Sequence, residues 1–254
     1  MRLKFATVGL CLAARAHAAP DDLVTRPLVL DAATVELRMT VEVDVQRSDI
    51  AQPLSLAPDV WWGISPRWTL GVIHSNASLD RIEAGATLCV RQDQAPPCDR
   101  LYHGSGLDVR YSALAGPLAV APRLRLVIRD LDPIKPVVTL GAMARWAHGR
   151  FAVATDPYLR IPLANAELGN RTQLVLPLWL TVQPASGWAI SLRTGYDSDL
   201  AVFRDGGHGP ISLGVTARAT ATVDLAIEAG WPRLLGPQHD ARHGTVLFAA
   251  ALWL

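Results

Sequence analysis

Arginine side chains recur at even separations within apolar stretches of the sequence. In the segment LAVAPRLRLVIRD, Arg123, Arg125 and Arg129 lie among apolar residues. Successive side chains of an extended strand point to opposite faces, so these three guanidinium groups would share one face. Such a ladder attracts anions or constricts a pore. The alternative is a network of structural ion pairs with carboxylates such as Asp108 and Asp156.

Charges of both signs fall on this same face in other segments. Opposite charges can pair across neighbouring strands in a wet interior, whereas an arginine that faces lipid near the bilayer midplane costs roughly 2–4 kcal/mol. The same charges would be equally stable on the outer surface of a soluble barrel, so the charges alone do not decide the orientation. The strand lengths and tryptophan positions given below favour lipid outside, and we therefore predict that the charged face points inward. The residues predicted to line that interior are Glu36, Arg38, Glu42, Asp108, Arg110, Arg123, Arg125, Arg129, Arg145, Arg160, Arg193 and Arg218.

The histidines are the candidates for acid–base or metal chemistry. Nucleophilic catalysis needs a histidine within hydrogen-bond reach of the nucleophile, and no histidine pairs in sequence with an outward-facing serine. The segment PQHDARH offers His239, Asp240 and His243, and RDGGHG (204–209) lies one predicted hairpin away. A hydrolytic or metal site in these loops is one reading. Polar loops carry such residues by chance, so we predict no enzyme activity, no metal site and no cofactor.

Cys89 and Cys98 lie in a long segment between predicted strands, 75–105, and the remaining cysteine, Cys11, falls in a predicted signal peptide. In an exported chain the pair predicts a disulfide, which would contribute roughly 2.5–3 kcal/mol by the chain-entropy estimate. The sequence leaves open whether this segment folds into the interior or caps it from outside.

The first residues of the chain have the parts of an export signal. Two basic residues precede the apolar run 5–14, and the triplet AHA at 16–18 suits signal cleavage. No later stretch reaches 18 uninterrupted apolar residues, so no transmembrane helix is predicted. The predicted organisation is a signal peptide over 1–18, a periplasmic N-terminal segment over 19–33, and one domain over 34–254.

Period-two patterning extends over most of that domain. In TVELRMTVEVDV (34–45), apolar and polar residues alternate without exception. Comparable segments give about twelve predicted strands. They lie at 34–45, 54–64, 67–74, 106–116, 118–130, 137–147, 151–161, 172–183, 188–197, 210–221, 223–232 and 245–254.

Short and long connections alternate between these strands. An up-and-down meander with both termini at the short-turn side produces this order, and a Greek-key sandwich has no reason to. The short connections are 65–66, 116–117, 147–150, 184–187 and 221–222, and the longer ones are 46–53, 75–105, 130–136, 162–170, 198–209 and 233–243.

Strand length indicates which solvent the apolar face meets. A strand of about ten residues, tilted near 40–45°, spans roughly 23–25 Å, which matches the apolar band of an outer-membrane barrel. Tryptophans also lie near predicted strand ends, where an interfacial aromatic belt is expected. These tryptophans are Trp62, Trp68, Trp146, Trp188 and Trp231.

Two hairpins, LAPDVWWGISPRWTLGV and LPLWLTVQPASGWAISLRTGYD, resemble those of Gram-negative outer-membrane β-barrel proteins of the small channel or transporter, porin-like type. The resemblance covers most of the mature chain. The last strand departs from the pattern, because such proteins usually end on an aromatic residue and this chain ends on Leu254. The resemblance implies location in the outer membrane, insertion by the barrel-assembly machinery and no organic cofactor.

These observations predict an all-β protein: a transmembrane, up-and-down antiparallel barrel with short periplasmic turns and longer extracellular loops. The predicted function is a narrow passive channel, or transport-associated pore, for small polar solutes. The alternatives are a non-conducting structural or surface-interaction barrel, and an outer-membrane hydrolase that uses the long loops. With 19% charged residues and a formal net charge of +1, the chain offers no basic surface for nucleic acid.

Overall fold

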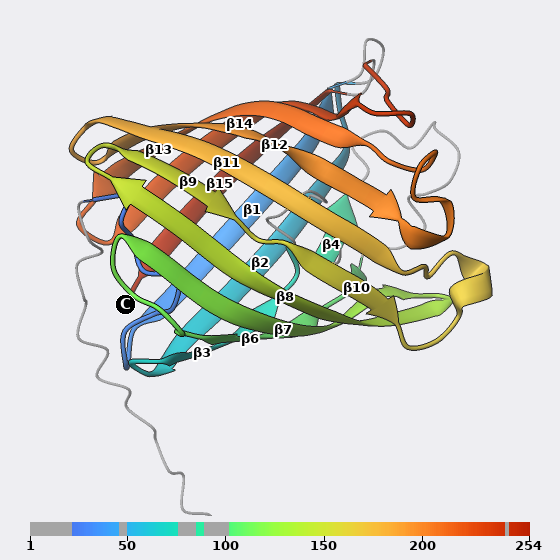
Figure 1. The fold of residues 1–254 in the computed structure, drawn as a ribbon, viewed down its shortest axis with the longest axis horizontal. Coiled ribbons are helices and arrows are strands. Elements are labelled where there is room, and N and C mark those ends of the chain that lie inside the picture. Colours follow the sequence, from blue (N-terminus) through green and yellow to red (C-terminus); the bar gives the residue numbers. More distant parts are fainter. Residues whose placement is uncertain (1–21, 46–49, 76–84, 89–101, 242–243) are drawn as a thin grey trace, which may run out of the picture.

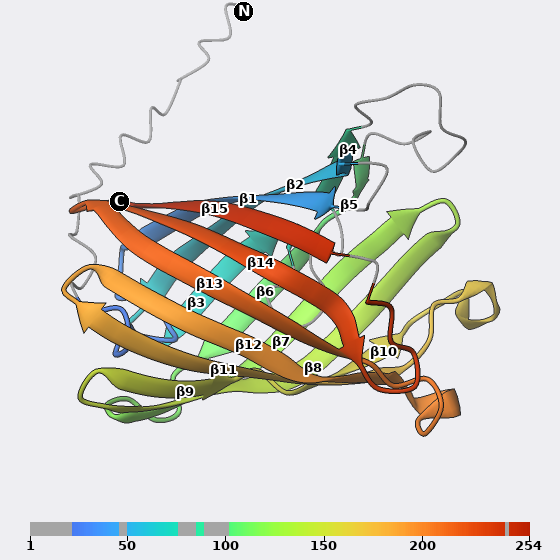
Figure 2. The same ribbon diagram turned by 90° about the horizontal axis from the view of Figure 1, so that it is seen from above.

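The computed structural model describes residues 22–45, 50–75, 85–88, 102–241 and 244–254. Its strands form one antiparallel sheet that closes on itself (Figures 1 and 2). The strands are β1 (Val35–Val45), β2 (Ile50–Ser65), β3 (Trp68–Ile73), β4 (Gly85–Leu88), β5 (Tyr102–Gly104), β6 (Gly106–Tyr111), β7 (Leu118–Leu131), β8 (Ile134–His148), β9 (Phe151–Thr155), β10 (Tyr158–Pro162), β11 (Gln173–Ala185), β12 (Trp188–Asp199), β13 (Gly209–Thr220), β14 (Val223–Leu235) and β15 (Gly244–Trp253). Two 3-10 turns, η1 (Ala166–Leu168) and η2 (Leu200–Val202), lie between strands. No helix among the described residues is long and apolar enough to cross a membrane.

The ring closes where the first strand meets the last. β1 pairs with β15 from Glu36 opposite Trp253 to Val45 opposite Gly244, and its other edge pairs with β2. Each further strand pairs with its neighbours in chain order. β9 and β10 both lie between β8 and β11, so they are two halves of one strand. The ring therefore has twelve strands, and the predicted up-and-down barrel is confirmed.

Two irregularities alter the wall without changing the number of strands in the ring. The β9–β10 strand is interrupted at Asp156 and Pro157, where proline has no N–H to give to a ladder. β4 pairs with β5 and with the same edge of β2 that β3 occupies nearer the other end. β4 and β5 thus prolong the wall, and they are the main described part of the predicted connection 75–105.

Three predicted connections differ from the structure. The predicted longer connection 46–53 is reduced to four residues, because β2 already begins at Ile50. The predicted longer loop 130–136 is a two-residue turn at Asp132 and Pro133, because β7 and β8 continue as a ladder beyond their apolar part. There the Nζ atom of Lys135 lies 3.4 Å from a carboxylate oxygen of Asp130. The predicted strand 106–116 stops at Tyr111, because residues 112–117 turn back and Leu114 bridges to Val120.

One end of the barrel, here called the short-turn end, carries the five turns at 66–67, 112–117, 149–150, 186–187 and 221–222 and the C-terminus. The connections of the opposite end are mostly longer, apart from the β7–β8 turn and the four-residue connection between β1 and β2. Four of the predicted belt tryptophans lie at the short-turn end, and Trp231 lies toward the other end of β14. All five are exposed, by 45–53%. The aromatic belt is therefore concentrated at one end of the barrel.

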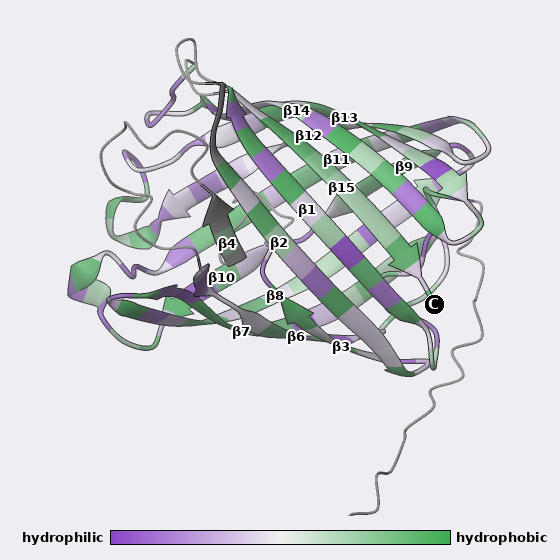
Figure 3. Cartoon of the chain, turned by 180° about the vertical axis from the view of Figure 1, so that it is seen from behind, coloured by the Kyte–Doolittle hydropathy of each residue, from purple (hydrophilic) through white to green (hydrophobic). Residues whose placement is uncertain are grey.

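The outer surface of the barrel is apolar. Large aliphatic side chains face outward from neighbouring strands, and Figure 3 shows hydrophobic residues alternating with hydrophilic ones along strands such as β1. Examples are Leu126, Leu140, Leu180 and Leu213, which are exposed by 48%, 50%, 43% and 59%. An apolar surface of this extent would be unstable in water. It matches the lipid-facing band of outer-membrane barrels, so the predicted outer-membrane location is supported by the fold itself.

The interior is correspondingly polar. The largest fully buried side chains include Arg125, Arg160, Asp59, Asp108 and Asp197. A soluble domain places such groups outside, since an uncompensated buried charge costs several kcal/mol. The distribution is therefore inverted relative to a soluble domain, and the interior charges must find partners within the lumen.

Replacing Leu140 by Arg tests the orientation of the wall. Leu140 lies near the middle of β8 and faces outward, so we expect the variant barrel to lose roughly 2–4 kcal/mol of unfolding free energy in phospholipid vesicles. Leu163→Arg, in the exposed segment after β10, is the control and should change stability by less than about 0.5 kcal/mol. Denaturant titration of both variants measures the difference, and equal losses would contradict a lipid-facing position for Leu140.

Candidate functional site

The predicted interior residues are buried or half-buried in the structure, and some of them take part in three clusters of charged side chains around a cavity. Among the twelve, the buried residues are Glu36, Glu42, Asp108, Arg123, Arg125, Arg145, Arg160 and Arg193, and the half-buried ones are Arg38, Arg110, Arg129 and Arg218. Their inward position follows from strand parity alone, that is, from the alternation of successive side chains between the two faces of a strand. Their partners, in contrast, are set by the order of strands around the ring.

The first cluster joins β6 and β7 to the break between β9 and β10. Arg123 donates to both oxygens of Asp108, from Nε at 2.7 Å and Nη2 at 2.8 Å, and its Nη1 donates to Asp156 at 2.6 Å. Arg110 Nε also donates to Asp108 at 2.8 Å, and Arg125 Nη2 donates to Asp156 at 3.2 Å. Both Arg123 and Arg125 of the predicted ladder are therefore engaged by carboxylates, which favours the ion-pair interpretation for this part of the lumen.

Aromatic side chains extend this cluster. Trp61 Nε1 donates to Asp108 at 2.9 Å, and the guanidinium groups of Arg38 and Arg110 lie 5.2 and 4.8 Å from the centre of the Trp61 ring. Arg125 lies over Tyr158 at 4.7 Å. Trp61 shares its face of β2 with Asp59, and its cation–π contacts with Arg38 and Arg110 were not predicted from the sequence. A tryptophan at a polar position of an otherwise alternating strand was the available signal.

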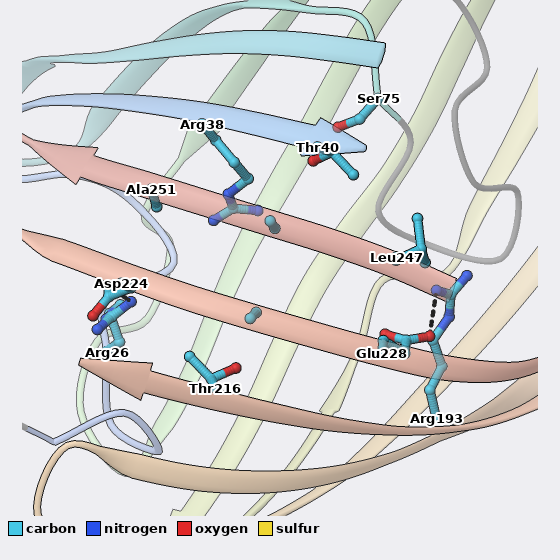
Figure 4. A pocket seen from close by; sticks show the side chains of 12 residues that line it. Arg26, Arg38, Thr40, Ser75, Arg193, Thr216, Asp224, Glu228, Leu247 and Ala251 are labelled. Carbon is cyan, nitrogen blue, oxygen red and sulfur yellow. Dashed lines mark hydrogen bonds and ion pairs between the residues drawn. The ribbon is translucent and has the colours of Figure 1, made fainter. Parts of the chain in front are cut away.

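A second cluster lies at the short-turn end around Asp224. This carboxylate is 2.7 Å from Arg26 Nη1 and 3.1 Å from Arg218 Nε, and it accepts a 2.8 Å hydrogen bond from Trp253 Nε1. Arg26 and Asp224 lie side by side in Figure 4. Burial lowers the pKa of the Arg26 guanidinium from its ordinary value, and the adjacent Asp224 carboxylate opposes that shift.

Arg26 reaches the lumen because residues 22–34, here called the strap, lie inside the barrel mouth. The backbone N–H of Leu23 donates to Gln183 of β11 at 2.7 Å, and that of Leu30 donates to Thr69 of β3 at 2.8 Å. Val24 packs on Ala147 and Ala152. The sequence predicted only a periplasmic segment over 19–33. Its scattered apolar residues have no strand period, and their burial depends on the shape of the mouth.

A third cluster lies farther along the lumen. Arg193 Nη1 of β12 lies 3.0 Å from Glu228 Oε1 of β14 (Figure 4), and the Ser212 hydroxyl of β13 donates to the same oxygen. Sequence parity predicted the inward position of Arg193. The pairing across three strands depends on the ring order.

A cavity of about 260 Å³ occupies the lumen between the second and third clusters. The wall behind it carries small side chains, Ala226, Ala249 and Ala251, from β14 and β15. Its remaining lining is hydroxyl groups, charged groups and one leucine: Thr40, Ser75, Thr216, Arg26, Arg38, Arg193, Asp224, Glu228 and Leu247 (Figure 4). The first cluster fills the side formed by β6, β7 and β9–β10, which lies across the ring. The open space therefore follows the small-residue wall.

The two predicted hydrolytic segments contact each other through Gln238, whose backbone N–H donates to the Gly207 carbonyl at 3.1 Å and whose side chain donates to the Asp205 carbonyl at 3.0 Å. His239 Nδ1 is 3.1 Å from the carbonyl oxygen of Gly236, and His208 Nε2 is 3.8 Å from Asp197. Among the described residues, no group of three or more His, Cys, Asp or Glu side chains is placed to hold a metal ion. The predicted disulfide residues Cys89 and Cys98, His243 and the predicted signal peptide 1–18 lie outside the described residues.

Comparison with known proteins identifies the fold. No family model and no curated protein matches the chain. Among solved structures, the chain is similar to a NanC porin, with a TM-score of 0.61 and 9% identity over 85% of this chain and 98% of that chain. An outer membrane channel from Pseudomonas putida F1 gives 0.61 and 10% identity over 89% and 97%. A KdgM porin in complex with disordered oligogalacturonate gives 0.57 and 8% identity over 85% and 98%. The chain thus has the fold of porin-like outer-membrane barrels.

Replacing Asp108 by Asn tests whether the first cluster is structural. The variant leaves Arg110 and Arg123 buried beside a neutral amide, and we expect it to lose roughly 3–5 kcal/mol of unfolding free energy. The control is Asp199→Asn, which weakens a pair with the 58% exposed Arg171 and should cost less than about 1 kcal/mol. Denaturant titration in vesicles compares the two, and an Asp108→Asn loss no larger than that of the control would refute the structural role.

Proposed function

We propose that this protein is a narrow passive channel for small polar solutes in the outer membrane. The observation that carries the proposal is the lumenal cavity, which is bounded by hydroxyl and charged groups on one side and by small side chains on the other. The fold shared with barrels described as porins and as an outer membrane channel supports it. Insertion by the barrel-assembly machinery after removal of a signal peptide over 1–18 belongs to the same proposal.

The filling of the lumen limits the size of the solute. A closed sheet of twelve strands is wider than the eight-stranded size at which side chains just fill the interior. Here buried ion pairs occupy the side of β6, β7 and β9–β10, and the space along β14, β15 and β1 remains. A solute would therefore pass between Arg38, Arg193 and the alanine wall. Such a path suits small hydrated molecules and excludes folded chains.

A non-conducting barrel is the second candidate function, and the strap is the observation that favours it. The strap crosses the short-turn mouth and buries Val24, Val29 and Leu30 there. If it filled that mouth, the barrel would serve as a structural or surface-interaction protein. Conductance distinguishes the two candidates directly.

Narrowing the cavity should lower conductance. Ala249 faces the lumen and its neighbour Ala250 faces lipid, so Ala249→Trp and Ala250→Trp are matched variants of one strand. In planar bilayers we expect the wild-type protein to give discrete conductance steps, Ala249→Trp to reduce the step size roughly twofold or more, and Ala250→Trp to leave it unchanged.

Folding of each preparation is checked by heat-modifiable migration on a gel, since a closed barrel resists unfolding until it is boiled. A folded wild-type barrel without conductance steps would overturn the channel and leave the non-conducting barrel. Equal effects of the two tryptophan variants would place the path elsewhere in the lumen.

A further inference from the structure

The strap crosses the short-turn mouth from one side of the ring to the other. Its start is bonded to Gln183 of β11 and packs on β8 and β9, and its later part is bonded to Thr69 of β3. Around the ring, the strands β8, β7 and β6 separate β9 from β3 on one side, and β11 to β15, β1 and β2 separate them on the other. The strap therefore spans the opening.

Backbone contacts with β2 hold the later part of the strap against the wall. The N–H of Ala33 donates to the Gly63 carbonyl at 2.8 Å, and the N–H of Gly63 donates to the Thr34 carbonyl at 2.9 Å. A Cβ atom added to Gly63 would lie 1.9 Å from the carbonyl oxygen of Asp31. Only a glycine at position 63 lets the strap backbone approach β2 this closely, so the strap has one defined position against the barrel wall.

Arg26 occupies the middle of this crossing. Its carbonyl oxygen accepts a hydrogen bond from Arg145 Nη1 of β8, and its guanidinium pairs with Asp224 of β14 at 2.7 Å. The same guanidinium lies over the Trp253 ring at 4.8 Å. Four strand positions separate β8 from β14 on one side of the ring and six on the other. Because Arg26 is held by both β8 and β14, it lies across the mouth. It also lines the cavity (Figure 4).

Asp224 is shared by Arg26 and Arg218, and the side chain of Arg145 donates to the backbone carbonyls of Arg26 and Gly116. Asp22 accepts backbone N–H groups of the strap. Among the charged side chains that line the cavity beside Arg26, three are guanidinium groups, Arg26, Arg38 and Arg193, and two are carboxylates, Asp224 and Glu228, so positive charge is in excess there. A narrow opening in a low-dielectric wall amplifies the field of such an imbalance.

We propose that Arg26 is a specificity-determining residue of the channel: the strap forms the constriction at the short-turn mouth, and Arg26 there favours small anions over cations. This inference rests on the proposed channel function. It assigns the selectivity to a residue outside the barrel strands, and it explains why a segment without strand pattern is bound to both sides of the mouth.

The reversal potential across a planar bilayer in a KCl gradient tests the proposal on the full chain. We expect the wild-type protein to prefer chloride over potassium, and Arg26→Gln, which retains length and hydrogen-bonding capacity, to lower the chloride-to-potassium permeability ratio roughly threefold or more. The control is Arg67→Gln. Arg67 is an exposed arginine of the β2–β3 turn at the same end, whose Nη1 donates to the Tyr111 hydroxyl of β6 at 3.5 Å, and its replacement should leave the ratio unchanged.

A second variant, Gly63→Ala, displaces the strap from its position against β2 without altering any charge. It should lower the permeability ratio as Arg26→Gln does and should also raise the unitary conductance, because the constriction opens. Heat-modifiable migration confirms that each variant is folded. A conducting wild-type barrel whose ratio is the same in Arg26→Gln, or whose conductance and ratio are the same in Gly63→Ala, overturns this inference and leaves the channel intact. A folded wild-type barrel that never conducts rejects the channel and the selectivity of Arg26 together.

Discussion

Backbone N–H and C=O groups in the hydrocarbon core of a bilayer cannot hydrogen-bond to water. The rest of this structure depends on that constraint. Each N–H and C=O of a strand in the bilayer needs a partner within the sheet, so only a closed ladder is stable there. The pairing of β1 with β15, together with that of β1 with β2, removes the free edges. The outer face then meets lipid and must be apolar, while the inner face carries most of the charged side chains that the strands hold.

Charges enclosed in this way must be compensated locally, and the compensation shapes the lumen. Asp108 and Asp156 neutralise arginines of β6 and β7 and fill one side of the barrel with their network. Small residues of β14 and β15 leave the other side open. The lumen is therefore asymmetric, and the polar cavity lies along the side where inward side chains are short. The strap adds Arg26 to that side and joins the open region to the short-turn mouth.

Strand parity made much of this barrel predictable. Strict alternation in β1 identified the inward positions of Glu36 and Arg38, and the spacing of turns identified an up-and-down ring of twelve strands. Parity cannot identify partners, so the contacts of Trp61 with Asp108 and of Arg193 with Glu228 required the ring order. The extension of the β7–β8 ladder to Leu131 and Ile134 was missed because it runs through polar residues beyond the lipid. The strap was missed because its burial comes from the shape of the mouth and not from a period in its sequence.

In this barrel the apolar side chains of the strands face lipid, and the charged side chains face an aqueous lumen. Spin labels placed one at a time from Val246 to Leu252 of β15, in a chain without native cysteines, measure this orientation directly. We expect labels at 246, 248, 250 and 252 to collide mainly with oxygen dissolved in lipid, and labels at 247, 249 and 251 to collide mainly with a water-soluble nickel complex. A two-residue period of opposite phase, or no period at all, would contradict the account.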